Sequence, residues 1–297
     1  MSVRELLLKR RFVRIDPARD AFLPAREAVR GRGCMPFVSR EGGRLLLRVA
    51  GEEAYFAMPV FRSAEDARSL LGMAEEAASA RGAGALTGPV SAGADGFGLG
   101  VPLDEETGAM PWHPDCPAEY ARWLEQAGYV RVRTMLELHR SVSGVRDPFA
   151  GAAERAEKAG CTLRRVRADS REACEAMYRV AADGAPAGFD ACAKVLRRVA
   201  RLAKDAHMQV ISRGGEPLGI LLAAEEEKGT RVLNIEVTEK ARRSVCAAAL
   251  LDAAWRQARG TVCVSTVDAE NTASLRIAQN AGFSVSGRWG IYRKILK

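Results

Sequence analysis

The distribution of hydrophobic and polar residues along the chain changes period many times. Short runs that are apolar at every position or at every second position predict strands, and longer stretches with apolar residues three or four positions apart predict helices. Over the 297 residues the two kinds of element alternate, and the alternation occurs twice. Such a pattern is typical of α/β or α+β domains rather than of helical bundles or sandwiches. A chain of this length can bury two cores, so we predict two domains, residues 1–145 and 146–297.

In the first half, local signals mark where several elements begin and end. Ser63 followed by Asp66 predicts the start of a helix, and Glu41-Gly42-Gly43 predicts a hairpin turn. The Gly-rich and Pro-rich residues 88–117 predict a long loop, and residues 141–160 are the predicted linker. The predicted strands are residues 12–15, 36–39, 44–49, 53–61 and 129–140, and the predicted helices are residues 17–30, 64–81 and 118–126.

The second half repeats the alternation. The pair Gly214-Gly215 predicts another hairpin, and the sequence Asn280-Ala281-Gly282-Phe283 repeats a helix-to-strand junction found in the first half at Gln126-Ala127-Gly128-Tyr129. Because glycine is common at helix ends, this repeat is weak support for duplication. The predicted strands are residues 162–167, 208–212, 218–224, 231–237, 261–267 and 283–295, and the predicted helices are residues 171–182, 191–206, 244–259 and 272–280.

The cysteines and the apolar runs restrict the class of protein. Seven cysteines occur without a C-x-x-C pair and without histidines at zinc-ligand spacing, which predicts buried or free thiols, no metal site and a cytoplasmic protein. The first residues lack the central apolar run of a signal peptide, and no later stretch reaches the ~20 apolar residues of a membrane-spanning helix. We therefore expect no membrane partner.

The net charge of +8 is confined to the second half. Residues 1–150 contain 20 basic and 20 acidic side chains, whereas residues 151–297 contain 25 and 17. An excess of positive charge suits an anionic ligand, such as a nucleotide-bearing cofactor or an RNA. A group of basic residues at helical spacing forms either a phosphate-facing stripe or an ordinary solvated helix face, which is the commoner arrangement. The group comprises Arg197, Arg198, Arg201 and Lys204.

Two segments of the second half resemble a known family. Residues 237–251, VTEKARRSVCAAALL, and residues 268–283, DAENTASLRIAQNAGF, are similar to the core of the GCN5-related N-acetyltransferases (GNAT). The resemblance covers roughly residues 205–297. It implies two tandem GNAT-like domains of the α/β (α+β) class, each with a mixed, mostly antiparallel, twisted sheet flanked by helices. The most specific positions are Asn271, Ser274, Gly282 and Phe283.

The first half resembles the N-terminal part of a bacterial tandem GNAT-like family. The similarity rests on residues 81–82, 86–91, 96–97 and 124–129 and covers most of residues 12–140. In that family the first half has no pyrophosphate loop, and here the acidic residues of the corresponding segment, FRSAEDA, are unsuited to phosphate. We therefore expect the cofactor site in the second half.

The resemblance implies a site for acetyl-CoA, or another acyl-CoA, between the end of a strand and the start of the next helix. Backbone amides of such a loop and the positive end of the helix would receive the pyrophosphate. Val245 replaces the family's first loop glycine and Ala247 the second, and a β-branched side chain at the first position would crowd the ligand or the backbone. Asn271 is equally suited to cap a helix. The implied binding residues are Val237, Thr238, Arg242, Arg243, Ser244, Val245, Cys246, Ala247 and Asn271.

The catalytic residues that the resemblance implies are incomplete. Family members commonly carry a tyrosine acid four residues before the Gly-Phe pair, where this chain has Ala278. Tyr292 is the nearest aromatic hydroxyl in the sequence and the candidate acid, with a packing role as the alternative. Glu236 is the candidate general base, with a surface position as the alternative. Backbone amides near Val237 and Thr238 would hold the oxyanion.

Three functions are compatible with these residues, ranked here in order. The first is acyl-CoA-dependent acetyl transfer to the amine of a small molecule or peptide. The second is a catalytically inactive GNAT-like binding module, which Val245 and Ala278 favour. The third is an aminoacyl-tRNA-dependent transferase, which the lack of long basic clusters with interleaved aromatics disfavours, so a nucleic acid is the less favoured partner. Residues of the long loop that would line a site for a cationic acceptor, or would simply be solvated, are Asp95, Asp104, Glu105, Glu106, Trp112 and His113.

Overall fold

The computed structural model describes residues 34–90, 100–105, 107, 116–142, 144–181, 189–202, 205–226, 229–242, 244–258 and 260–296. The predicted strand 12–15 and helix 17–30 lie outside these residues. The chain divides into two compact units. The first unit consists of Met1–Leu136, Asp268–Glu270 and Gly287–Lys297, and the second unit of Glu137–Val267 and Asn271–Ser286. Strands β6 (Val130–Ser141) and β12 (Ser284–Ile295) therefore contribute residues to both units. The domain boundary at residue 145 stays a prediction.

The sheet of the first unit begins with three antiparallel strands, β1 (Cys34–Val38), β2 (Arg44–Ala50) and β3 (Glu53–Val60). The next strand, β4 (Ala85–Gly88), runs parallel to β3. The order is β1-β2-β3-β4-β12-β6, and the short β5 (Val101–Pro102) pairs with β12. Since β12 is antiparallel to β4, the end of the chain completes a sheet that begins near residue 34.

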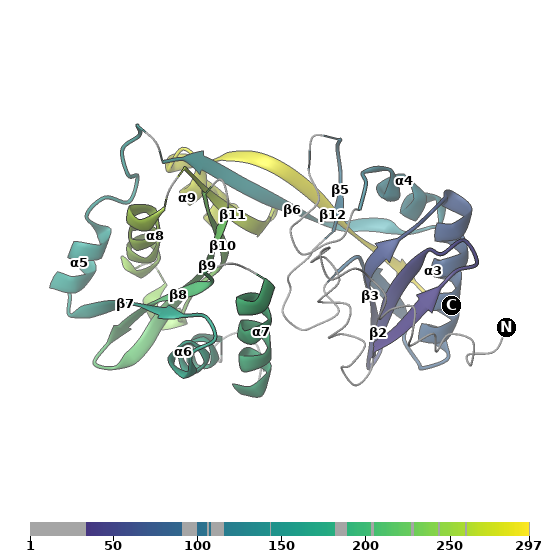
Figure 1. Cartoon of the computed structure of the whole chain (residues 1–297), viewed down its shortest axis with the longest axis horizontal. Coiled ribbons are helices and arrows are strands. Elements are labelled where there is room, and N and C mark those ends of the chain that lie inside the picture. Colours follow the sequence, from purple (N-terminus) through teal and green to yellow (C-terminus); the bar gives the residue numbers. More distant parts are fainter. Residues whose placement is uncertain are drawn as a thin grey trace. The chain divides into compact units, whose positions relative to one another are not determined.

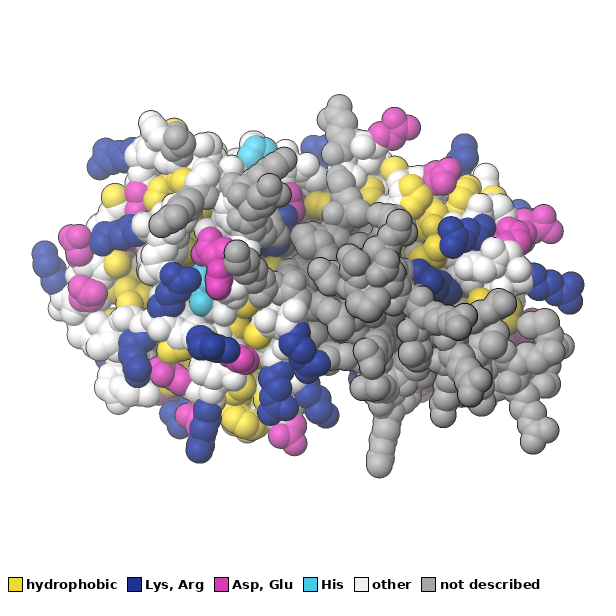
Figure 2. All heavy atoms as spheres, viewed as in Figure 1, with side chains coloured by type: hydrophobic (Ala, Val, Ile, Leu, Met, Phe, Trp, Pro, Cys, Tyr) yellow, Lys and Arg dark blue, Asp and Glu magenta, His cyan; other side chains and the backbone are white. Residues whose placement is uncertain are grey.

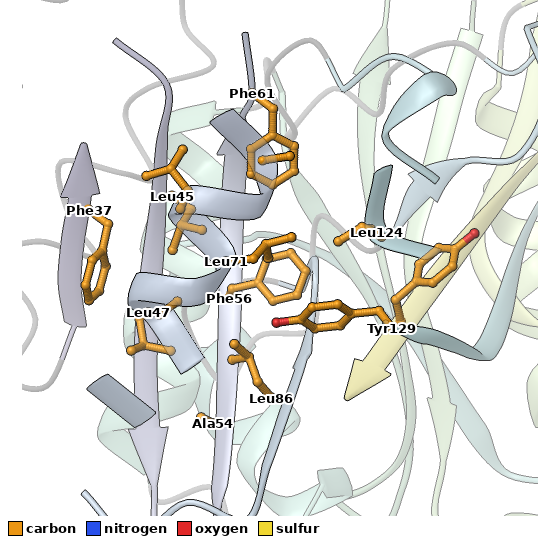
Figure 3. Close-up of a cluster of buried hydrophobic side chains, with 14 of the residues drawn as sticks. Phe37, Leu45, Leu47, Ala54, Phe56, Phe61, Leu71, Leu86, Leu124 and Tyr129 are labelled. Atoms are coloured by element: carbon orange, nitrogen blue, oxygen red, sulfur yellow. The ribbon is translucent and has the colours of Figure 1, made fainter. Parts of the chain in front are cut away.

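Helix α3 (Ala64–Ser79) begins where the capping signal predicts. The Ser63 hydroxyl accepts a hydrogen bond from the Asp66 amide at 3.0 Å. In the core beneath the helix, Figure 3 shows Leu71 of α3 beside Phe56 of β3. The ring of Tyr129 packs edge to face against Phe56, with 5.8 Å between the centroids. Helix α4 (Glu119–Gln126) also contributes to this core through Tyr120 and Leu124.

The sheet of the second unit is also mostly antiparallel. Its order is β6-β11-β10-β9-β8-β7, in which β7 to β10 are successive antiparallel neighbours and β10 is parallel to β11. Figure 1 shows α8 on one face of this sheet and α6 and α7 on the other. The strands are β7 (Cys161–Arg167), β8 (His207–Arg213), β9 (Glu216–Glu226), β10 (Gly229–Val237) and β11 (Thr261–Asp268), and the helices are α5 (Ala152–Lys158), α6 (Arg171–Ala181), α7 (Phe189–Leu202), α8 (Cys246–Gln257) and α9 (Thr272–Asn280), with a 3-10 turn at Glu239–Ala241.

The predicted fold class is confirmed, since mostly antiparallel sheets flanked by helices make up the described chain. The elements that were predicted within the described residues occur in the predicted order, with ends that differ by a few positions. The structure adds β4 and β5, which the pattern did not predict, and β5 lies inside the predicted long loop. Helix α5 lies inside the predicted linker. Every helix in the described part of the chain is too short or too polar to span a bilayer. The cysteines that the structure describes as buried free thiols are Cys116, Cys161, Cys174, Cys192 and Cys246.

Candidate functional site

The parallel strands β10 and β11 pair over only part of their length. Their described register runs from Gly229↔Thr261 to Val232↔Val264. A bulge then interrupts the pairing of β10 with β9 between Val232 and Asn234. Residues 230–233 are buried, whereas residues 234–237 are half-buried. Past the bulge, residues 234–237 of β10 have no partner on β11 in the described register. We name these four residues the open edge of β10.

The amide of Val237 points toward this open edge. The next amide, that of Thr238, donates to the Leu218 carbonyl of β9 at 2.9 Å. Because hydrogen-bonded and non-hydrogen-bonded pairs alternate along an antiparallel ladder, the backbone groups of Val237, which lies opposite Gly219, point away from β9. The Thr238 amide is therefore engaged inside the sheet and is not a donor for an oxyanion. Of the two predicted donors, only the Val237 amide points away from β9, and its role toward an oxyanion stays a prediction.

The side chain of Glu236 lies on the face of the sheet that carries α7. Directly opposite residues share a face, and neighbours along a strand point to opposite faces. Glu236 is opposite Ile220, whereas the adjacent Leu221 shares its face with Gln209, whose amide donates to Gln257 of α8 at 3.0 Å. Glu236 therefore faces away from α8.

The thiol of Cys192 on α7 supports this placement of Glu236. Burial, the neighbouring Cys174 thiol and the Glu236 carboxylate all raise the pKa of Cys192, with burial the largest cause. The carboxylate of Glu236, one of the open-edge residues, is consequently within electrostatic range of α7.

The loop that precedes α8 presents donors rather than acids. Arg242 and Ser244 are exposed, and the Ser244 hydroxyl donates to the Ala241 carbonyl at 2.6 Å and accepts from the Cys246 amide at 3.2 Å. The first bond of the helix runs from the Ala249 amide to the Val245 carbonyl at 2.8 Å, so the earlier first-turn amides have no acceptor within the helix. The first turn of α8 contains no acidic residue. Arg243 lies outside the described residues.

Val245 has an ordinary helical backbone. Its φ is −71° and its ψ is −7°, a region open to every L-residue. The predicted conflict between a β-branched residue and the backbone of the loop therefore does not arise in this structure, and only the bulk of the half-buried side chain remains as an obstacle to a ligand. Cys246 is buried, and Ala247 is half-buried beside it.

No protein-family model and no curated protein matches the sequence. Solved structures resemble it instead. A tandem GNAT protein from the clavulanic acid biosynthesis pathway has a TM-score of 0.62 at 14% identity, with 93% of this chain and 88% of that chain covered. A GCN5-related N-acetyltransferase from Sphaerobacter thermophilus has a TM-score of 0.54 at 19% identity, with 92% and 86% covered. A GCN5-related N-acetyltransferase from Kribbella flavida has a TM-score of 0.52 at 16% identity, with 93% and 95% covered. This chain has the GNAT fold.

Within the GNAT fold, Asn271 acts as a helix cap. Its side-chain oxygen accepts a hydrogen bond from the Ser274 amide at 3.1 Å, at the start of α9. Farther along the same helix, Ala278 places a methyl group where a tyrosine acid was expected, and its carbonyl accepts from the Phe283 amide at 2.9 Å. The structural alternative for Asn271 is thus observed, and its role toward a cofactor stays a prediction.

Tyr292 is a core residue of the first unit. It is 1% exposed, and its hydroxyl donates to Glu125 at 3.4 Å. Burial, followed by the Glu125 carboxylate, raises the pKa of Tyr292 to about 12. Glu236 belongs to the second unit. Tyr292 therefore has the packing role, and its hydroxyl is not proposed as the acid.

A buried ion pair that the sequence did not reveal shares a sheet face with Glu236. Arg231 of β10 lies opposite Ala224, on the α7 face, and is 8% exposed. Its guanidinium donates to the carboxylate of Glu137 on β6, which also accepts from the Ser286 hydroxyl at 2.9 Å. The one signal in the sequence is an arginine directly before the apolar pair Val232-Leu233 of a predicted strand. Its partner is 94 residues away and could not be read from the pattern.

Only part of the predicted acceptor loop is described. Asp104 and Glu105 line a cavity of about 510 Å³ in the first unit, together with Cys116 and Glu119. One oxygen of Asp104 accepts from both the amide and the hydroxyl of Thr107, at 2.7 and 2.6 Å. Among the described residues no cluster of His, Cys, Asp and Glu has the arrangement of a metal site. The residues of this loop that lie outside the described chain are Asp95, Glu106, Trp112 and His113.

Proposed function

We propose that this chain is an acyl-CoA-dependent N-acyltransferase that transfers an acetyl group to an amine of a small molecule or peptide. The observation that carries the proposal is the open edge of β10, which ends at the loop and first turn of α8. A thioester carbonyl at the open edge would accept from the Val237 amide, and a diphosphate at the start of α8 would accept from the first-turn amides of that helix. The Val237 amide points away from the β9 ladder, and the first-turn amides have no acceptor within the helix. The GNAT fold of the chain agrees with this proposal.

The donor set fits acetyl-CoA. The first-turn amides of Ala247 and Ala248 and the Arg242 guanidinium offer donors to a diphosphate, with no carboxylate in the first turn to oppose it. In addition, the hydroxyl oxygen of Thr238 is buried without a hydrogen-bond partner in the described chain. A buried hydroxyl without a partner lowers the free energy of unfolding by about 1–3 kcal/mol. A hydrogen bond to a ligand atom would recover that stability.

When bound, acetyl-CoA supplies a thioester whose carbonyl carbon bonds to the amine nitrogen as the carbon–sulfur bond breaks. Glu236 accepts the proton that the amine loses. The Val237 amide donates to the carbonyl oxygen as negative charge develops on it. Ala278 provides no proton, so the departing thiolate is protonated by water. This is acceptable chemistry because a thiol with a pKa of about 8.5 is a good leaving group.

A second candidate function is a binding module with the GNAT fold that does not catalyse transfer. Two observations favour it: Ala278 lacks a hydroxyl, and Tyr292 is enclosed in the core of the first unit. This module would bind an acyl-CoA or another diphosphate at the same loop without turning it over. Binding and turnover must therefore be measured separately.

Binding is tested by isothermal titration with acetyl-CoA and with CoA. We expect a dissociation constant in the range of roughly 1 μM to 1 mM, typical of enzyme substrates. Arg242→Glu places a negative charge against the diphosphate and should weaken binding at least about tenfold. Lys158→Glu is the matched control, since Lys158 is exposed on α5 of the same unit. If the unchanged protein shows no binding at millimolar ligand, the acyl-CoA proposal fails.

Turnover is tested by release of free thiol in the presence of a panel of small amines and peptides. Glu236→Gln keeps the size of the side chain and removes its basicity, so it should lower turnover about 10²-fold or more while leaving acetyl-CoA affinity unchanged. Binding without thiol release from any amine would favour the module. Equal turnover by the unchanged protein and by Glu236→Gln would remove Glu236 from the mechanism.

A further inference from the structure

Two exposed aromatic rings meet on the surface of the second unit. Tyr178 of α6 is 41% exposed and Phe189 of α7 is 39% exposed. Their rings pack edge to face, with 6.1 Å between the centroids and an interplanar angle of 79°. They are the two aromatic members among the exposed large hydrophobic residues of the described chain. Rings in such a position offer their free faces and edges to a partner rather than to the core.

A row of basic side chains runs along the exposed face of α7. Lys194, Arg197 and Arg201 are exposed at spacings of three and four residues, which place them about 4.5 and 6 Å apart along the helix axis. The buried side of the same helix carries Cys192 and Leu196. Figure 2 shows Lys and Arg side chains gathering over α7. The helix thus presents positive charge to solvent along most of its length, and Asp190 is its one acidic residue.

The rings and the basic row belong to one surface, which we name the α6–α7 surface. Helices α6 and α7 pack against each other, and the Tyr178–Phe189 pair lies where α7 begins. Burial raises the pKa of the Cys174 thiol on α6, and the Arg197 guanidinium opposes this shift. Arg197 is therefore within electrostatic range of α6, the helix that carries Tyr178.

We propose that the α6–α7 surface binds a single-stranded nucleic acid. Phosphates would lie along Lys194, Arg197 and Arg201, and unpaired bases would stack on Tyr178 and Phe189. The basic row alone would suit any polyanion, and the rings alone would suit an apolar peptide. Their combination fits a chain of phosphates with accessible bases. A duplex fits poorly, because its bases are already stacked on each other. The excess positive charge of residues 151–297 has the sign that such a partner requires.

The test is fluorescence anisotropy with labelled oligouridine of about 12 nucleotides, within the usual site sizes of single-strand-binding surfaces. The same measurement is made with a duplex of that length and with labelled heparin, at about 50 mM salt. The purified full chain is used without acyl-CoA, so the outcome is independent of the proposed transferase activity. We expect the single strand to bind more tightly than the duplex, with an affinity that falls as salt rises.

Two paired variants separate stacking from charge. Tyr178→Ala with Phe189→Ala should weaken oligouridine binding about tenfold and leave heparin binding unchanged. Lys194→Glu with Arg197→Glu should weaken both ligands and reduce the salt dependence. The matched controls are Ile277→Ala, a 53% exposed apolar residue of the same unit, and Lys158→Glu. Circular dichroism checks that each variant is folded, and the single aromatic variants replace the double one if it unfolds.

Three results would overturn the proposal. The first is the absence of oligouridine binding by the unchanged chain at low salt. The second is an aromatic variant that binds oligouridine as well as the unchanged chain does, which would reduce the surface to a nonspecific polyanion site. The third is equal affinity for the duplex and for the single strand.

Discussion

The ammonium group of Lys294 on β12 donates to the carboxylate of Glu75 on α3 at 2.8 Å, across 219 positions of sequence. The other oxygen of Glu75 accepts from the Tyr129 hydroxyl at 3.0 Å, and Lys294 lies over the Tyr129 ring, 5.5 Å from its centroid. The last strand is thereby bound to the helix and to the core of the first unit. Its residues Trp289, Ile291 and Tyr292 are 3%, 3% and 1% exposed.

Removal of residues 287–297 should therefore unfold the first unit. β4 would lose its antiparallel neighbour, and the core would lose a tyrosine and its share of apolar contacts. Hydrogen exchange would detect this as loss of protection in β2 and β3. Removal of residue 297 alone is the control and should leave that protection in place. Full protection in the longer deletion would show that β12 is dispensable to the unit.

The carboxylate of Asp252 on α8 holds the start of α5. It is 0% exposed and accepts from the Ala153 amide at 2.8 Å and from the Arg256 side chain at 2.7 Å. Asp252→Ala leaves the Ala153 amide buried without a partner, so we expect the free energy of unfolding to fall by about 1–3 kcal/mol. Urea denaturation measures this. Glu154→Ala removes only an exposed contact to Arg256 at 3.4 Å and should change stability by less than about 1 kcal/mol.

His207 makes stability depend on pH. Burial lowers the pKa of this 4% exposed side chain; the Asp205 carbonyl opposes the shift and the Arg165 guanidinium adds to it. A lowered pKa in the folded state means that the unfolded chain takes up the proton first. The contribution of His207 is therefore complete above about pH 6.5, the ordinary histidine value, and is lost as the pH falls toward the folded pKa. His207→Gln should flatten the stability profile between about pH 7.5 and 5.5, measured by urea denaturation. If the stability profile of His207→Gln matches that of the unchanged protein, groups other than His207 cause the pH dependence.

Val245 should limit the affinity of the proposed cofactor site. Since its φ of −71° suits any residue, Val245→Gly removes side-chain bulk without correcting a strained backbone. We expect acetyl-CoA to bind severalfold more tightly to Val245→Gly, with Val245→Ala intermediate, in isothermal titration. An affinity that is the same in all three proteins would place the valine side chain away from the ligand.

The sequence by itself determined most of the elements and their order, but not β4 or β5. Ser63 caps α3 as predicted, and the glycines of the two hairpins lie between antiparallel strands. These signals could be read because capping and turn formation depend on residues three or four positions apart. The loop before α8 and the alanine at position 278 were likewise visible in the pattern of the GNAT family, which is local to one strand, loop and helix.

Tertiary structure alone decided which groups are available for chemistry. The end of the described β10–β11 pairing at Val232, the difference between the Val237 and Thr238 amides, and the enclosure of Tyr292 all follow from which strands become neighbours. Tyr292 is paired with Gly88, and such a pairing between distant residues leaves no mark in the local hydrophobic period. Tyr292, which lies near the family motif in sequence, is therefore a core residue of the first unit, because strand pairing and burial are properties of the assembled sheet.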